Sequence, residues 1–371
     1  MVNSSTMTLI VIVMAFYFIG MIAISWMGRK YGKNFDDFIS AGRNCTTLMI
    51  IGSAVGSHIG NGYVVGGAAS GAAVGLSGAW YGIGCALSYL AVALVLNHRV
   101  YKCGYISLPE ILNARYGEKM TSVIFSVTTA LSYIANIAAQ LMAGKALFEA
   151  LGFNGTLGVW VIAVVVMAYS CISGLWGACA TSVVQVAIII VSLLATFFIV
   201  LGRGAFGLVT EAVANGLAPA SYFDMGADGI AAILITIVPI SLASLCEQCT
   251  VQRITSAKSE KTSFRALILS VIIMIPCALM PAFIGMYGYV LFGDTTNSVF
   301  FKVALDVLPS FFAALLIAAV VAAIMSTIDT MFVAFSTIIM HNIYRGMINP
   351  DASEGTLKKG DFACHLFLTV G

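Results

Sequence analysis

Three oxygen donors inside a long apolar stretch share one face of the helix that this stretch predicts. Ala323, Ser326 and Thr327 stand at positions i, i+3 and i+4, so one backbone carbonyl and two hydroxyls lie together. Neutral oxygen ligands suit a hard monovalent cation, whereas thiolates and imidazoles suit softer metals. The spacing leaves a second interpretation open, in which the hydroxyls donate hydrogen bonds to carbonyls of their own helix or to a neighbouring helix.

A glycine-rich stretch supplies a second group of candidate residues. Seven glycines between positions 52 and 71 surround His58 and Asn61. Glycine costs a helix up to about 1 kcal/mol per position relative to alanine, so this density indicates either close helix packing or an unwound segment. Close packing fits the spacing of Gly52, Gly56 and Gly60. An unwound segment would instead present free carbonyls and His58 to a water-filled cavity.

The apolar stretch from 229 to 246 predicts a second interrupted helix. Pro239 lies near its middle and removes one helical hydrogen bond, and the hydroxyls of Ser241 and Ser244 can satisfy the carbonyl that is left free. Taken alone, such a proline indicates a kink more often than a binding site.

Two further polar residues lie inside apolar stretches. Gln140 suits a hydrogen bond to a neighbouring helix or to a ligand. Asp329 lies two positions after Thr327, and an acid at membrane depth is a functional candidate by default. Proton transfer through Asp329 or His58 is therefore an alternative to cation binding.

The elements that must position these residues are membrane-spanning helices. The chain has 371 residues, of which 60% are hydrophobic and 9% charged, against about 25% charged residues in an ordinary soluble domain. Most of its surface must therefore face lipid. The net charge of +2 gives no indication of a nucleic-acid partner. The sequence also shows no Ser/His, paired-acid or HExxH arrangement at membrane depth, so we do not expect an enzyme.

Charge-free stretches divide the chain into spans of about 20 residues, the length that crosses a bilayer as a helix. The stretches 43–99 and 149–203 each have room for two spans. We expect the first to break at its glycines between 71 and 78, and the second near Gly174 and Gly177. The other spans are expected at 6–27, 119–145, 229–246, 266–292 and 310–344.

Basic residues give these spans a direction. Fifteen of the eighteen Lys and Arg residues lie in alternate loops, at 29–43, 99–119, 253–265 and 345–359. The positive-inside rule places these loops in the cytoplasm and the N-terminus outside the cell membrane. The glycine-rich span and the Pro239 span then cross in opposite directions. Interrupted helices at corresponding places in two inverted halves of a sequence indicate a transporter.

Five short motifs, in order across residues 38 to 345, resemble those of the sodium:solute symporter family. They are Phe38–Arg43 (F-x-x-A-G-R), Tyr105–Gly117 (around L-P-E), Gly174–Gln185 (beginning G-L-W), Val251–Ser259 (beginning V-Q-R) and Ala322–Ser336 (around A-A-I-M-S-T-x-D). Each motif alone is weak, but five in the same order make a strong resemblance.

The resemblance implies an all-α polytopic membrane protein that forms one transmembrane domain over residues 1–371. An extra N-terminal helix at 6–27 would precede two inverted five-helix repeats, the first at 46–202 and an incomplete second at 229–371. The second repeat would need two more helices, of which only the stub from Phe362 to Gly371 is present. We therefore expect a symporter that is truncated at its C-terminus.

The resemblance also implies a sodium site between the glycine-rich helix and the Ala323 helix. Its ligands would be three carbonyls and two hydroxyls, from Gly56, Ile59, Ala323, Ser326 and Thr327. We expect the solute beside this site, in contact with His58, Tyr63, Gln140, Ser241 and Ser244.

Two departures from the family pattern bear on the ion and the solute. Ser182 follows Thr181 where many members carry an aspartate, which argues against a second sodium ion. The carboxylate and the polar and aromatic residues that the sugar-binding branch uses are missing, which argues for a solute smaller than a sugar.

The leading hypothesis is sodium-coupled secondary active symport of a small organic solute, an amino acid or an organic acid, across the cell membrane. Its expected partners are Na⁺, the solute and the lipid bilayer. One alternative is a non-transporting membrane sensor or a truncated fragment. Another is a proton-coupled transporter that uses His58 or Asp329.

Overall fold

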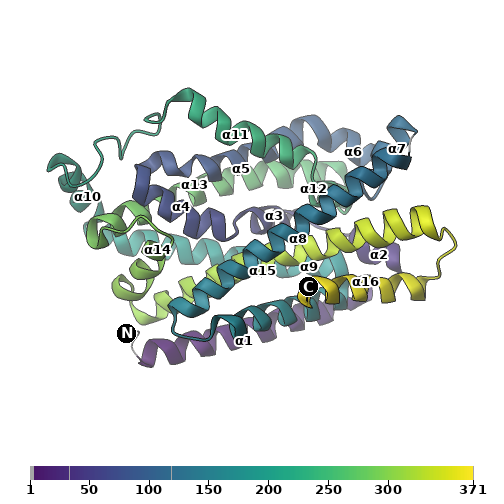
Figure 1. The fold of residues 1–371 in the computed structure, drawn as a ribbon, viewed down its shortest axis with the longest axis horizontal. Helices are drawn as coiled ribbons and strands as arrows, with labels where there is room; N and C mark the ends of the chain where they lie inside the picture. Colours follow the sequence, from purple (N-terminus) through teal and green to yellow (C-terminus); the bar gives the residue numbers. More distant parts are fainter. Residues whose placement is uncertain (1–3, 33, 118, 371) are drawn as a thin grey trace.

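The computed structural model describes residues 4–32, 34–117 and 119–370, and every regular element in these ranges is a helix (Figure 1). The helices that build the bundle are α1 (Ser4–Gly28), α3 (Thr47–His58), α4 (Asn61–Val74), α5 (Trp80–Ala91), α6 (Asn97–Cys103), α8 (Lys119–Ala150), α9 (Gly155–Gly202), α11 (Gly229–Leu245), α12 (Gln248–Thr255), α13 (Glu260–Phe292), α15 (Ser310–Ser336) and α16 (Glu354–Val370). Shorter helices connect them: α2 (Phe35–Ser40), α7 (Leu108–Tyr116), α10 (Ala205–Ala214) and α14 (Ser298–Lys302). Among the described residues, six helical stretches are long and apolar enough to cross a membrane, and a bent pair raises this to seven.

The two longest of the six stretches, with 48 and 43 residues, are each broken at a glycine. The 48-residue α9 would be about 72 Å long as one straight helix, against a hydrocarbon core of about 30 Å. Gly174 interrupts it with φ 55° and ψ −143°, where a Cβ atom would lie 2.4 Å from the Phe38 carbonyl oxygen. Gly75, with φ +77°, separates α4 from the stretch that contains α5 and α6. Both breaks lie where the sequence predicts them.

The helix that carries the predicted oxygen cluster belongs to the most buried of the six long apolar stretches. Nearly every residue of α15 from Ala313 to Ser336 is buried, and the helix packs against α1, α3, α8 and α9. Figure 1 shows α15 running through the middle of the molecule. Its hydroxyl groups therefore contact protein rather than lipid.

Two helices are interrupted near the centre of the bundle. The α3 and α4 helices are separated by Ile59 and Gly60, and the backbone of Gly60 is extended. The α11 and α12 helices meet at an angle of 56°. Both breaks leave helix ends inside the protein, where backbone groups can face a ligand.

The second break differs from the prediction. The α11 helix continues through Pro239, and the chain leaves the helix at Cys246 and Glu247, where Glu247 has the extended values φ −92° and ψ 131°. The expectation of an interruption at Pro239 is therefore wrong. A proline removes a single helical hydrogen bond, which membrane helices tolerate, whereas an extended residue redirects the chain.

The last helix also differs from the prediction. It begins at Glu354 rather than Phe362 and has 17 residues. Its first half carries charged residues, so hydropathy does not reveal it, yet Leu357 and Asp361 are buried where α16 packs against α9 and α15.

The predicted basic loops gather at one end of the bundle, which we call the basic end. Here α2, α6, α7 and the segment between α15 and α16 lie close together (Figure 1). Arg345, beyond α15, donates a 2.6 Å hydrogen bond to Asp36 of α2. His341 lies 2.6 Å from Glu110 of α7. These contacts fasten the end of the α15 segment to both short helices.

Candidate solute and sodium sites

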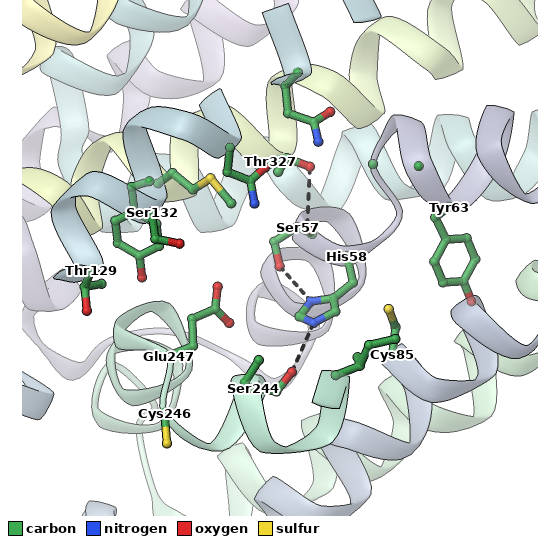
Figure 2. Close-up of a pocket in the computed structure, with 18 of the residues that line it drawn as sticks. Ser57, His58, Tyr63, Cys85, Thr129, Ser132, Ser244, Cys246, Glu247 and Thr327 are labelled. Carbon is green, nitrogen blue, oxygen red and sulfur yellow. Dashed lines mark hydrogen bonds between the residues drawn. The ribbon is translucent and has the colours of Figure 1, made fainter. Parts of the chain in front are cut away.

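A cavity of about 480 Å³ lies between the two helix breaks and α8 (Figure 2). Residues from several helices and their junctions line it: Ser57, His58, Gly60, Gly62, Tyr63, Tyr81, Cys85, Thr128, Thr129, Ser132, Tyr133, Asn136, Gln140, Ile240, Ala243, Ser244, Cys246, Glu247, Thr327 and Met331. Its volume lies within the usual range for small-molecule sites. Hydroxyl, amide, imidazole and carboxylate groups all face a space that the surrounding apolar helices enclose.

The predicted oxygen cluster faces the end of α3. The Thr327 Oγ1 atom lies 3.0 Å from the Ala323 carbonyl and 3.3 Å from the Ser57 carbonyl. Thr327 thus donates back to its own helix, as the second interpretation expects, and it also reaches across to α3. The Ser326 Oγ atom lies 3.2 Å from that of Ser182 on α9.

The glycines of α3 allow this close approach. A Cβ atom at Gly56 would lie 2.2 Å from Ser326 Oγ, and one at Gly60 would lie 3.0 Å from Thr327 Oγ1. Any larger residue at Gly56 would therefore displace the Ser326 hydroxyl. The structure brings Gly56, Ser326, Thr327 and Ala323 together around the α3 break, with Ile59 at its C-cap. Carbonyls and hydroxyls form a donor set that suits Na⁺.

His58 lies in the cavity wall and contacts three side chains. Its Nδ1 atom lies 2.8 Å from the Tyr89 hydroxyl and 3.4 Å from Ser57 Oγ, and its Nε2 atom lies 3.5 Å from Ser244 Oγ. The structure therefore joins His58 and Ser244, which are 186 residues apart in sequence. Ser241, one turn earlier on α11, is not among the residues that line the cavity.

The other two predicted solute contacts line the same cavity from different helices. Tyr63 presents its ring, while its hydroxyl donates a 2.6 Å hydrogen bond to the Met274 carbonyl of α13. Gln140 approaches from α8, and its Oε1 atom is buried without a hydrogen-bond partner in the described part of the chain. A ligand could therefore use the Gln140 amide at little cost to the protein.

Arg253 lies beside the site, although the distribution of basic residues predicts a cytoplasmic loop at this position. The structure buries it on α12, with 1% of its surface exposed. Its guanidinium donates to Ser53 Oγ at 3.2 Å, to the Tyr89 hydroxyl at 3.0 Å and to Ser57 Oγ at 2.6 Å. Arg253 thereby joins α12 to α3. Only its place in the V-Q-R motif distinguishes it from a loop arginine in the sequence.

Asp329 lies outside the cavity, on the far side of α15. It is fully buried, and its carboxylate accepts hydrogen bonds from Tyr169 at 2.9 Å, Thr330 at 3.2 Å and Thr181 at 3.4 Å. These donors come from α9 and α15. Asp329 therefore joins two helices of the bundle and does not reach the solute cavity.

Comparisons with known proteins agree with this architecture. The model of the sodium:solute symporter family matches residues 38–370. The sodium/proline symporter of Escherichia coli (strain K12) is 24% identical over 369 residues, which cover 92% of this chain and 71% of the relative. The high-affinity proline transporter PutP of Bacillus subtilis (strain 168) is also 24% identical, over 91% of this chain and 74% of the relative.

A more distant relative and a solved structure extend the comparison. Sodium/glucose cotransporter 1 of Oryctolagus cuniculus is 24% identical over 89% of this chain and 57% of its own length. A Na⁺-coupled sialic acid symporter, solved in a substrate-bound outward-open state, superposes with a TM-score of 0.83 over 98% of this chain and 79% of that chain. At 17% identity, this match shows a shared fold.

The family match covers nearly the whole chain, and the spans, breaks and cavity fit a secondary transporter rather than an enzyme. The chain belongs to the sodium:solute symporter family, and it is a multi-pass membrane protein for Na⁺-coupled symport of a small organic solute.

Proposed function

We propose that this symporter binds Na⁺ between the break in α3 and the middle of α15, and the solute in the adjoining cavity. The ligands would be the carbonyls of Gly56, Ile59 and Ala323 and the hydroxyls of Ser326 and Thr327. The observation that carries the proposal is the position of Thr327 Oγ1, between the carbonyls of Ala323 and Ser57.

Coupling follows from a site that is shared by two helices. Na⁺ bound between α3 and α15 stabilises conformations in which these helices are close. The solute binds next to the same break, near His58, Tyr63, Gln140 and Ser244. A ligand shifts a conformational equilibrium only by as much as its affinities for the two states differ. Each ligand therefore favours the conformation that the other also prefers, and the two are transported together.

The bacterial relatives named for proline support an amino-acid-sized solute. The distribution of basic residues supports a cytoplasmic basic end and an N-terminus outside the cell. The oppositely directed breaks at α3–α4 and α11–α12 support inverted repeats over 46–202 and 229–371, after the extra helix α1.

The experiment is a Thr327→Ala variant compared with Thr236→Ala. Thr236, on α11, also donates back to its own helix, to the Ala232 carbonyl at 3.0 Å, but it does not line the cavity. We expect Thr327→Ala to raise the Na⁺ concentration for half-maximal effect about tenfold or more, because a charge-assisted contact contributes about 1.5–3 kcal/mol. Thr236→Ala should leave that concentration unchanged.

The readout does not require a known solute. Cys246 is exposed and lines the cavity, so the rate at which a methanethiosulfonate reagent modifies it reports the state of the cavity as Na⁺ is added. Uptake of L-proline into proteoliposomes provides a second readout. An unchanged Na⁺ dependence of Cys246 modification in Thr327→Ala would refute the sodium-site assignment.

A further inference from the structure

The solute cavity has one acidic side chain and no lysine or arginine among its lining residues in the described chain. Glu247 supplies the acid, from the extended junction between α11 and α12. Figure 2 shows its carboxylate pointing into the cavity, toward the side on which Ser57 and His58 lie. The side chain is 23% exposed, so it is accessible from the cavity.

The contacts of Glu247 in the described chain leave room for a ligand. Its Oε2 atom accepts a 3.3 Å hydrogen bond from Thr250 and lies 3.9 Å from Nη1 of Arg253. Arg253 does not complete the hydrogen bonding of the carboxylate, because its nitrogens donate to Ser53, Ser57 and Tyr89. Both of these contacts involve Oε2, so Oε1 can accept from a donor in the cavity.

The buried arginine and the carboxylate are arranged asymmetrically. Arg253 is 1% exposed and lies behind the hydroxyls of Ser57 and Tyr89. A solute in the cavity therefore meets the Glu247 carboxylate directly but reaches the guanidinium only through these hydroxyls. Because charge-assisted hydrogen bonds are short and direct, this geometry favours a cationic donor and disfavours an anion at this end of the cavity.

The part of the cavity wall that α8 forms also offers acceptors. The buried Oε1 atom of Gln140 has no partner among the described residues, and Asn136 lies one turn earlier on the same helix. An ammonium group has several N–H donors and no acceptor, which matches a carboxylate and amide oxygens that line the same cavity. A simple organic acid would bring a second negative charge close to the Glu247 carboxylate, and the two charges would repel each other.

We propose that Glu247 binds a protonated amine of the transported solute, so that the solute is an amine-bearing molecule rather than a simple organic acid. This inference rests on the proposed function, because it places the solute in the same cavity. The chemistry is shared by zwitterionic amino acids and by plain amines, and the experiment separates the two.

The test measures protection of Cys246 from methanethiosulfonate modification in a Cys103→Ser background, since Cys103 is the other exposed cysteine among the described residues. The probes are matched by skeleton: L-proline with cyclopentanecarboxylate and pyrrolidine, and L-alanine with propionate and ethylamine. In each set, one probe carries both an amine and a carboxylate, and each of the other two probes carries only one of these groups. We expect an amine-bearing member to protect Cys246 in the presence of Na⁺, while the matched carboxylate does not.

Variants of Glu247 provide the second arm. Glu247→Gln should weaken protection at least tenfold in solute concentration, and Glu247→Asp should restore part of it, because the charge returns. Glu211→Gln neutralises an exposed carboxylate on α10 and should change nothing. The size-exclusion profile of each purified variant shows whether it folds, and only folded variants are compared.

The outcomes separate the two claims. Na⁺-dependent protection by a carboxylate that lacks an amine would overturn the role of Glu247 and leave the symport function intact. Protection by no amine-bearing probe, or equal protection in Glu247→Gln, would also overturn that role. Protection that is independent of Na⁺ for every probe would contradict the proposed sodium site instead. Protection by proline and alanine but not by pyrrolidine or ethylamine identifies amino acids as the source of the amine.

Discussion

The contact between α4 and α13 yields a sharp stability prediction. A Cβ atom built on Gly71 would lie 2.1 Å from the carbonyl oxygen of Ala282, whereas ordinary contacts begin at 3.4 Å. From the other helix, a Cβ atom on Gly285 would lie 1.8 Å from the carbonyl oxygen of Ala68. The two backbones are thus in direct contact, and no side-chain rotation could accommodate an added methyl group.

Gly71→Ala should therefore force α4 and α13 apart by roughly 1 Å. Overpacking of this kind costs about 1–3 kcal/mol, and the better helix propensity of alanine offsets at most about 1 kcal/mol of it. Gly66, on the same helix, has its nearest such neighbour at 4.0 Å. Gly66→Ala consequently gains the propensity without the clash, and serves as the control.

Thermal unfolding of the purified protein in detergent, followed by tryptophan fluorescence, measures the difference. We expect Gly71→Ala to melt several degrees below the wild type, and Gly66→Ala at or slightly above it. Both variants change one glycine to alanine in the same helix, so any effect of the substitution on membrane insertion or expression should be the same in both. Equal melting temperatures for the two variants would refute the reasoning from close backbone contact at Gly71.

Three more predictions concern Arg253, Cys103 and Asp294. Arg253→Lys keeps the positive charge but loses the forked guanidinium that reaches three hydroxyls. We therefore expect the variant to lower the rate of Na⁺-dependent uptake at least tenfold. A wild-type rate would contradict the role of Arg253 in joining α12 to α3. A membrane-impermeant maleimide should label Cys103, at the basic end, in inside-out vesicles and not in intact cells; the reverse pattern would invert the proposed orientation. Hydrogen bonds from Lys302, Ser298 and Thr296 lower the pKa of Asp294 well below its ordinary value. The stability lost in Asp294→Asn should then be constant from about pH 5 to pH 8 and shrink below about pH 4, because the carboxylate is protonated in the unfolded chain before it is protonated in the folded protein. Melting curves across pH measure this loss, and a loss that does not shrink at low pH would contradict the prediction.

Glycine positions show how far the sequence predicts the fold. The break at Gly174 was predictable because an apolar stretch too long for one crossing must bend, and glycine adopts the required backbone angles without steric cost. In the 52–71 stretch, however, the two interpretations of the glycines are both correct at different positions. Gly52 and Gly71 allow close packing, Gly60 forms the break, and Gly62 has open space around it. Spacing alone does not distinguish them, because the difference lies in which distant helix approaches each glycine.

The candidate site was only partly predictable, because its residues meet through contacts between distant parts of the sequence. Helical spacing places Ala323, Ser326 and Thr327 on one face, but it does not identify the helix that this face contacts. The contact between Thr327 and Ser57 joins residues 270 positions apart. Pro239 drew attention to the correct span but to the wrong position, because an acidic residue such as Glu247 does not by itself predict an extended backbone. Hydropathy likewise fails to predict the burial of Arg253, because the sequence does not distinguish a buried, hydrogen-bonded arginine from an arginine in a loop.

The two broken helices act together because of this arginine. Arg253 of α12 donates to Ser53 and Ser57 of α3, so two charge-assisted hydrogen bonds hold the broken helices to each other, and a third fixes the guanidinium against Tyr89 of α5. The contact from Thr327 to α3 is of a different kind, a single hydroxyl at 3.3 Å from one carbonyl. The α12 helix also reaches the segment that follows α15, where Gln252 donates a 2.7 Å hydrogen bond to Thr337. Because the guanidinium links α12 directly to α3, we expect the solute-binding groups on the two broken helices to move as one unit as Na⁺ binds and leaves.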